Sequence, residues 1–184
     1  MKLKTRDMIL VAMFTALTAI GAFIKIPVGP APITLQFLFT ALAGIMLGSR
    51  LGALSQLVYV VLGLIGIPIF TSGGGISYIF KPTFGYLIGY IIGAYVIGKI
   101  AESVKKPSYV RLLVASLIGV AVVYIIGVPY LYVILKYVVG AKITVMGALK
   151  AGMILFIPGD IAKCIITAAL AVKVVPIVRK AALV

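Results

Sequence analysis

Two oppositely charged side chains lie inside an apolar segment near the end of the chain. Asp160 is followed three residues later by Lys163, in the run Gly-Met-Ile-Leu-Phe-Ile-Pro-Gly-Asp-Ile-Ala-Lys-Cys-Ile-Ile, and the chain has only 3 acidic residues. Side chains three positions apart share one face of a helix, where each charge can offset the other. Because ionisable residues at membrane depth are costly and usually functional, this pair is the leading candidate for a binding site.

The chemistry of the pair suits a small molecule that carries both N–H groups and an anionic group. A carboxylate accepts hydrogen bonds from N–H donors, whereas an ammonium attracts a carboxylate. Pro158 and Gly159 interrupt the helix beside Asp160 and open backbone groups to a ligand. The alternative is an ion pair that only fixes helix packing, but such a pair adds little stability over apolar packing. Ligand binding is therefore the favoured interpretation.

Further candidates lie near the ends of other apolar segments. Gln36 could exchange hydrogen bonds with a ligand, and an interhelical hydrogen bond is an equally good interpretation. Consecutive glycines allow unusual backbone conformations and close approach to a ligand, and here they are Gly73, Gly74 and Gly75. Four aromatic residues could wall a pocket or belong to the aromatic belt at the membrane interface, namely Tyr78, Phe84, Tyr86 and Tyr90.

The first apolar segment carries a pattern of small residues. Ala12 and Ala16 are four positions apart, with Thr15 and Ala19 beside them. Small residues at this spacing let a second helix approach closely. The partner could be another helix of the same chain or a helix of another subunit, and the pattern alone does not choose between them.

The composition indicates an integral membrane protein, since 64% of the 184 residues are hydrophobic and 11% are charged. The formal net charge of +14 does not predict nucleic-acid binding, because the basic residues lie between apolar runs rather than on one patch. With one cysteine and no histidine, the usual transition-metal sites, histidine-based catalytic triads and an internal disulfide are not predicted. No phosphate-binding loop occurs, so the chain is not expected to hydrolyse ATP.

The apolar stretches predict an all-α membrane protein with six transmembrane helices in a single domain, 1–184. A crossing needs about 17 to 25 apolar residues. The first stretch follows Lys2, Lys4 and Arg6 and lacks a clear cleavage site, so it is interpreted as a retained helix. The predicted spans are approximately 8–24, 33–49, 51–67, 83–99, 110–126 and 147–172.

The distribution of basic residues predicts the orientation, because Lys and Arg are retained on the cytoplasmic side. One side holds only Lys25, Lys81, Lys136 and Lys142. The other side, predicted to be cytoplasmic with both termini, holds Lys2, Lys4, Arg6, Arg50, Lys99, Lys105, Lys106, Arg111, Lys173, Arg179 and Lys180. The longer connections 26–33, 68–82 and 127–146 then face outward and are expected to form a structured cap.

Four blocks, in this order, resemble the BioY family, the biotin-binding S components of energy-coupling factor transporters. They are Pro-Ala-Pro-Ile-Thr-Leu-Gln at 30–36, Gly-Leu-Ile-Gly-Ile-Pro-Ile-Phe followed by three glycines at 63–75, Pro-Thr-Phe-Gly-Tyr-Leu-Ile-Gly-Tyr at 82–90, and Pro-Gly-Asp-Ile-Ala-Lys at 158–163. The resemblance extends over nearly the whole chain. It implies a multi-pass protein of a prokaryotic plasma membrane that binds biotin from outside.

The resemblance also implies partners and roles for individual residues. The partner module consists of a transmembrane coupling protein and two ATP-binding subunits. Asp160 and Lys163 would lie in the biotin pocket, and Ala12 and Ala16 would dock the coupling protein. The residues expected to line or cover the pocket are Gly73, Gly74, Gly75, Tyr78 and Tyr86. Biotin is the transported ligand in this interpretation, and no cofactor or metal is expected.

The sequence departs from the family pattern in two places. Lys81 stands where a glycine is expected before Pro-Thr, and the chain contains no asparagine, so the asparagine and arginine that some members contribute to the pocket have no assigned counterpart. Two other functions stay open at this point. An S component for thiamine or riboflavin would share the architecture, whereas a small intramembrane enzyme would use Asp160 and Lys163 for acid-base chemistry.

Overall fold

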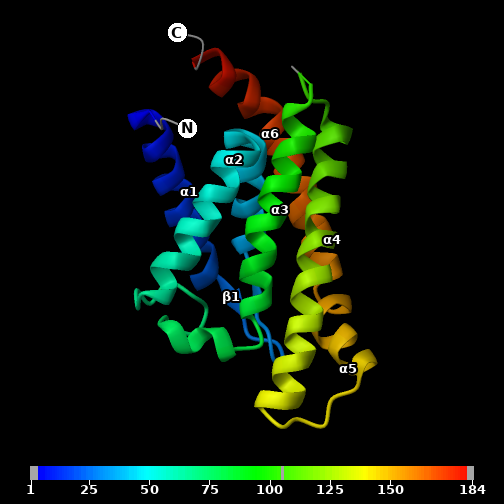
Figure 1. Cartoon of the computed structure of the whole chain (residues 1–184). Helices are drawn as coiled ribbons and strands as arrows, with labels where there is room; N and C mark the ends of the chain where they lie inside the picture. Colours follow the sequence, from blue (N-terminus) through cyan, green and yellow to red (C-terminus); the bar gives the residue numbers. More distant parts are fainter. Residues whose placement is uncertain (1–3, 105, 182–184) are drawn as a thin grey trace.

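The computed structural model describes residues 4–104 and 106–181, with side chains described up to residue 176. Lys2 and Lys105, which contribute to the predicted orientation, lie outside the described residues, as do the side chains of Arg179 and Lys180. The elements, labelled in Figure 1, are α1 (Thr5–Phe23), β1 (Lys25–Ile26), β2 (Ile33–Thr34), α2 (Gln36–Leu64), η1 (Ile76–Phe80), α3 (Phe84–Glu102), α4 (Tyr109–Val133), η2 (Ile134–Val138), α5 (Val145–Leu149), η3 (Lys150–Ile154) and α6 (Ile157–Ala181).

The protein is a helical bundle, and its described residues include five helical segments long and apolar enough to cross a membrane. These are Thr5–Phe23, Gln36–Leu64, Phe84–Glu102, Tyr109–Val138 and Val145–Pro176. The predicted count of six separate spans is therefore not confirmed. The difference arises because the predicted spans 33–49 and 51–67 both fall in α2.

The helix α2 reverses its direction at Gly48, where φ is 82° and ψ is 178°. A positive φ of this kind favours glycine, because a side chain would be strained there. Thr40 Oγ1 donates to Gln56 Oε1 at 3.0 Å, and the Cα of Gly44 lies 2.8 Å from the position that a Cβ on Gly52 would occupy. Residues 36–47 and 49–64 therefore lie side by side and antiparallel.

The predicted connection 127–146 is shorter in the structure than expected. The helix α4 passes through Pro129 and reaches Val133, and the π-helix η2 continues it to Val138. A proline removes one backbone donor, but membrane helices tolerate this when neighbouring groups satisfy the backbone. The last predicted span, 147–172, is also interrupted, because α5 and the π-helix η3 precede α6.

The two ends of the bundle differ in structure. The start of α1, the end of α6 and the link from α3 to α4 lie at one end, while β1, η1 and α5 lie at the other (Figure 1). At that second end, β1 and β2 pair antiparallel, with Lys25 opposite Thr34, and η1 forms a turn of 3-10 helix. The connections at the end opposite the termini are therefore ordered, and they cover that end of the helices.

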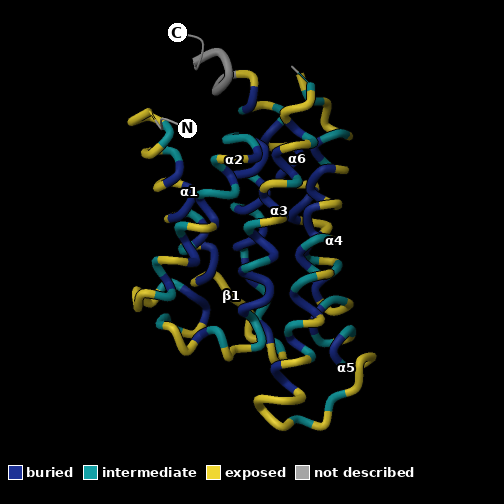
Figure 2. The backbone as a smooth tube through the Cα atoms, in the orientation of Figure 1, coloured by how far each residue is buried: buried dark blue, intermediate teal, exposed yellow. Residues whose placement is uncertain are grey.

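The close contacts of α3 with its neighbouring helices depend on two of its glycines. A Cβ on Gly98 would lie 2.3 Å from the backbone nitrogen of Ser49, and a Cβ on Gly89 would lie 2.9 Å from the Cα of Val123. Neither position has room for a larger side chain, so α3 packs directly against α2 and α4. Buried residues follow the inward side of each helix, and exposed residues follow the outward side (Figure 2).

Candidate functional site

The predicted pair, Asp160 and Lys163, is buried in the first turns of α6, with 8% and 7% of each residue exposed. Lys163 Nζ forms an ion pair with Asp160 Oδ1 and donates a hydrogen bond to the Thr34 carbonyl oxygen at 2.9 Å. The Tyr124 hydroxyl donates to Asp160 Oδ2. The pair therefore connects α6 to β2 and to α4, and both carboxylate oxygens have a donor.

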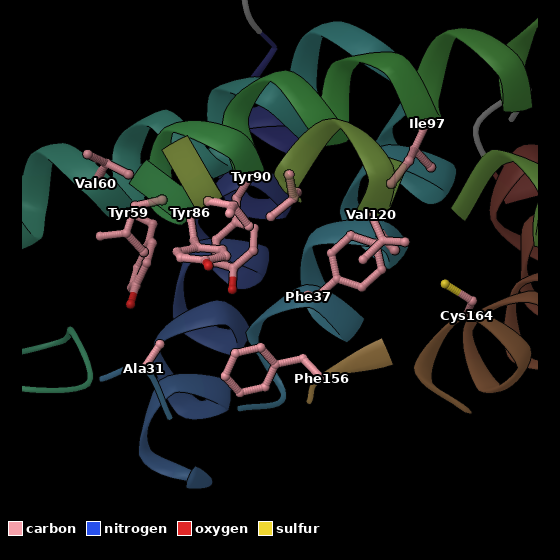
Figure 3. Close-up of a cluster of buried hydrophobic side chains, with 14 of the residues drawn as sticks. Ala31, Phe37, Tyr59, Val60, Tyr86, Tyr90, Ile97, Val120, Phe156 and Cys164 are labelled. Carbon is pink, nitrogen blue, oxygen red and sulfur yellow. The ribbon is translucent and has the colours of Figure 1, made fainter. Parts of the chain in front are cut away.

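A cavity of about 600 Å³, counting its opening, borders this group. Its wall combines residues of the covered end with residues from the helices. In Figure 3 the rings of Tyr86 and Tyr90 project from α3 toward Ala31 and Phe156. The complete wall consists of Ala31, Pro32, Ile33, Thr34, Gln36, Phe37, Thr71, Tyr78, Thr83, Tyr86, Leu87, Tyr90, Val120, Val123, Tyr124, Phe156, Asp160 and Lys163.

The two predicted tyrosines are in this wall, and the protein holds both hydroxyl groups. The Tyr86 hydroxyl donates to the Gly152 carbonyl oxygen at 2.7 Å. The Tyr78 hydroxyl lies 2.8 Å from Thr71 Oγ1 and 3.1 Å from Thr83 Oγ1. These bonds fix the rings, so their apolar faces form a preorganised boundary for a ligand.

Gln36 also lines the cavity. Its amide makes a hydrogen bond between helical segments, which was one of the two roles considered for it. Its Nε2 donates to the Tyr59 hydroxyl at 2.9 Å, and its Oε1 accepts from Thr34 Oγ1 at 3.1 Å. The Tyr59 hydroxyl in turn donates to the Ile69 carbonyl oxygen at 2.9 Å. Gln36 therefore ties β2, the second half of α2 and the following connection together at the cavity wall.

The predicted glycines are not among the described residues of the cavity wall; they shape the loop that carries Thr71 and Tyr78. Gly73 and Gly75 have φ values of 102° and 100°, which favour glycine. The Gly75 backbone nitrogen donates to the Gly63 carbonyl oxygen at 2.7 Å. A Cβ on Gly74 would lie 2.3 Å from the Ile67 carbonyl oxygen. The three glycines thus let the loop fold back over the end of α2.

Ala12 and Ala16 are exposed on α1, whereas neighbouring residues on the other face of this helix are buried. Thr15 Oγ1, for example, donates to the Ser55 carbonyl oxygen at 2.9 Å. The two alanines are not in the wall of the cavity among the residues described. The small-residue pattern is therefore on the outside of the bundle, where a helix of another protein could pack against it.

Sequence reasoning missed Tyr124, Thr34 and Phe156. Tyr124 lies in the charge-free run Ala-Val-Val-Tyr-Ile-Ile, where its hydroxyl needs a hydrogen-bond partner once buried. That requirement was the available signal, although its partner is 36 positions away in sequence. Thr34 contributes a backbone carbonyl, which any residue type could supply, and Phe156 resembles the many other apolar residues of its segment.

The donors of this site suit an uncharged polar group rather than a metal ion. Asp160 and Lys163 together carry no net charge, and Tyr124 adds a hydroxyl. Within residues 4–104 and 106–181, no group of three metal-binding side chains comes together. The arrangement offers a carboxylate that can accept from N–H groups, inside a cavity whose remaining wall is aromatic and aliphatic.

Comparison with known proteins gives consistent matches over nearly the full chain. A protein of Lysinibacillus sphaericus, described as a probable biotin transporter BioY, is 45% identical over 177 residues, which cover 96% of this chain and 90% of that protein. The biotin transporter BioY of Thermotoga maritima is 38% identical over 169 residues, which cover 91% of this chain and 95% of that protein.

A solved structure matches as well. The S component for biotin from an ECF-type ABC transporter superposes with a TM-score of 0.81 at 28% sequence identity, and the match covers 94% of both chains. The model of the BioY family matches residues 1–180. The resemblance of the four sequence blocks is thereby confirmed, and the chain belongs to the BioY family.

Proposed function

We propose that this protein captures biotin as the S component of an ECF-type importer. The observation that carries the proposal is the group of Asp160, Lys163 and Tyr124 in the wall of a cavity that measures about 600 Å³ with its opening included. The named relatives are biotin transporters, and the solved neighbour is an S component for biotin. They are transport proteins rather than enzymes, so the pair serves binding and not turnover.

In this proposal Asp160 accepts a hydrogen bond from a ureido N–H of biotin. Lys163 holds that carboxylate in place, because it pairs with Asp160 and donates to the Thr34 carbonyl oxygen. The bicyclic ring system of biotin packs among Phe37, Tyr86, Tyr90 and Phe156. The connection that carries Thr71 and Tyr78 covers the ligand on the outer side.

The proposed topology has six crossings in one membrane domain, with both termini in the cytoplasm of a prokaryotic cell. The two antiparallel halves of α2, 36–47 and 49–64, count as separate crossings in this scheme. The excess of basic residues at the end that holds the termini supports this orientation. The cavity then opens toward the outside of the plasma membrane.

The proposed partners are a transmembrane coupling protein and two ATP-binding subunits, which supply the energy for uptake. Ala12 and Ala16, exposed on α1, are the proposed contact with the coupling protein. Replacing both with tryptophan should leave biotin binding unchanged and abolish uptake in cells that express the whole transporter, because bulky side chains keep the helices apart. Loss of biotin binding in this variant would instead mean that the alanine face packs within the chain.

A ligand panel tests the substrate directly. The protein is purified in detergent and incubated separately with biotin, thiamine and riboflavin. The amount of each vitamin that it retains is measured by equilibrium binding. Retention of biotin alone supports the proposal, and biotin that co-purifies from cells supports it independently. Preferential retention of thiamine or riboflavin would assign the chain to another vitamin, and chemical conversion of the bound molecule would reassign it to an enzyme.

A further inference from the structure

The ion pair of Asp160 and Lys163 has no spare charge to balance the carboxylate of a ligand. Biotin carries a carboxylate at the end of its valerate chain, but Lys163 is already paired with Asp160 and also donates to the Thr34 carbonyl oxygen. Bringing a second carboxylate to this couple would add a net negative charge to a poorly solvated site. A ligand with one free carboxylate therefore needs a further cation near the cavity.

Lys25 is placed to supply that cation. It lies in β1 directly opposite Thr34 of β2, and Thr34 lines the cavity. The Lys25 ammonium donates to the carbonyl oxygen of Thr71, which is also part of the cavity wall. Lys25 therefore contacts the cavity wall in two ways, since its backbone pairs with Thr34 and its side chain binds Thr71.

The bond to Thr71 leaves the ammonium with donor capacity. An ammonium has three N–H donors, and in the described part of the chain the structure gives Lys25 Nζ one acceptor, the Thr71 carbonyl oxygen. That carbonyl orients the ammonium at the rim and does not neutralise its charge. A carboxylate arriving at the opening can accept the remaining hydrogen bonds.

The charge of this end of the protein favours an anion. The chain has 3 acidic residues, Asp7, Glu102 and Asp160, and only Asp160 belongs to the cavity. Exposed lysines at the covered end of the bundle include Lys25, Lys81, Lys136 and Lys142. Of these, Lys25 is the one whose ammonium is bonded to a residue of the cavity wall, as far as the described residues show.

We propose that Lys25 binds the carboxylate of the ligand at the rim of the cavity, while Asp160 and Lys163 bind its uncharged polar end. The assignment rests on the proposed capture of biotin and names the residue that recognises the anionic end of that molecule. The site then has two charged parts: the Asp160–Lys163 ion pair inside the cavity, and the Lys25 ammonium at its opening. Lys25 is thus a specificity-determining residue for acids over their neutral analogues.

The test compares biotin with biotinamide, which has the same rings and chain but no charge. Lys25→Gln keeps a hydrogen-bond donor for Thr71 and removes the charge. It should weaken biotin binding about 5- to 30-fold, as expected for a charge-assisted hydrogen bond at a partly exposed site, and change biotinamide binding by less than about 2-fold. Lys25→Arg should keep most of the preference for the acid.

Lys81→Gln is the matched control, because it removes an exposed lysine of the same end whose ammonium makes no such bond to the described cavity wall. It should leave both affinities and their ratio unchanged. Equal weakening of biotin and biotinamide binding in Lys25→Gln would overturn the assignment and make Lys25 a support of the loop. An unchanged biotin affinity in Lys25→Gln would overturn it as well. If the unmodified protein bound no biotin, the proposed function itself would fail before any variant was compared.

Discussion

Asp160 and Glu102 are two carboxylates at opposite ends of the same bundle, and their hydrogen bonding is alike. Asp160 accepts from the Tyr124 hydroxyl and pairs with Lys163. Glu102 accepts from the Ser49 backbone nitrogen at 2.9 Å and from the Ser49 hydroxyl at 2.7 Å. Each carboxylate therefore links its own helix to another element, and each has a lysine three residues away, since Lys99 Nζ lies 3.6 Å from Glu102 Oε1.

The two sites differ in the space beside the carboxylate. Glu102 Oε2 lies 2.7 Å from the position of a Cβ on Gly48, so the reversal of α2 fills its surroundings with backbone, and 38% of its side chain faces solvent. Asp160 is buried and borders a cavity. A hydrogen-bonded carboxylate therefore marks a binding site only where a cavity lies beside it. At the reversal of α2, the hydrogen-bonded Glu102 carboxylate instead holds the backbone of the turn.

Neutralising each carboxylate in turn should separate the two sites most clearly. Asp160→Asn should weaken biotin binding about 100-fold or more, because the amide loses the charged acceptor and leaves the Lys163 ammonium without its counterion. The measurement is the equilibrium dissociation constant of detergent-purified protein, with size-exclusion behaviour recorded to confirm that the variant is folded.

Glu102→Gln is the matched control for that experiment. It should lower the free energy of unfolding by about 1 kcal/mol through weaker bonds to Ser49, and leave the biotin affinity within about 2-fold. An unchanged affinity in Asp160→Asn, or a large loss in Glu102→Gln, would show that the cavity beside Asp160 is not the ligand site.

A smaller effect is expected when the carboxylates are kept and one donor to each is removed. Tyr124→Phe deletes the hydroxyl that binds Asp160 Oδ2 and keeps the ring. It should weaken biotin binding about 10-fold, because the carboxylate is no longer oriented and loses one hydrogen bond made to a charged group. Dissociation of labelled biotin is the convenient measurement, since the loss should appear mainly in the off-rate.

Ser49→Ala removes the corresponding hydroxyl from Glu102 and retains the backbone donor. Its thermal stability should fall and its rate of biotin dissociation should equal that of the unmodified protein. Should Ser49→Ala accelerate dissociation as much as Tyr124→Phe does, the two ends of the bundle would be coupled and the distinction between them would fail.

The same two ends show what the sequence could and could not predict. Asp160 and Lys163 stood out because charges are rare in apolar segments, and their i, i+3 spacing already placed them on one face. Their partners were not predictable in the same way: Thr34 acts through its backbone carbonyl, and the Tyr124 hydroxyl reaches across from another helix. Long-range pairs of this kind depend on tertiary packing, and periodicity reports only local structure.

The helices themselves were predicted better than the turns between them. Charge-free runs located the starts of the apolar segments to within a few residues. Arg50 was expected in a link between two helices, whereas the reversal occurs at Gly48. The connection after the predicted span 110–126 was expected to begin at Gly127, and α4 instead continues through Pro129 to Val133. Gly73, Gly74 and Gly75 were expected to line or cover the pocket; the structure shows how they set the path of the loop that carries Thr71 and Tyr78, and their contact with a ligand stays a prediction.

The smallest effect on binding is expected from replacing one glycine by alanine at each end of the bundle. A Cβ on Gly152 would lie 2.5 Å from the Tyr86 hydroxyl, the movable end of a side chain, so Gly152→Ala should push Tyr86 into the cavity and weaken biotin binding about 3- to 5-fold. A Cβ on Gly98 would meet the Ser49 backbone, which has less freedom to shift. Gly98→Ala should therefore cost about 1–3 kcal/mol of stability without changing the affinity.

Thermal unfolding and biotin affinity are measured on both variants. Together they distinguish a glycine that keeps the cavity open from a glycine that lets two backbones pack closely. The expected pattern is a lower affinity with little loss of stability for Gly152→Ala, and the reverse for Gly98→Ala. Because both substitutions add one methyl group to a glycine in close contact, the added volume cannot account for a difference between them. Equal losses of affinity would mean that the packing of α3 against the reversal of α2 also shapes the cavity, and that the two ends act as one unit.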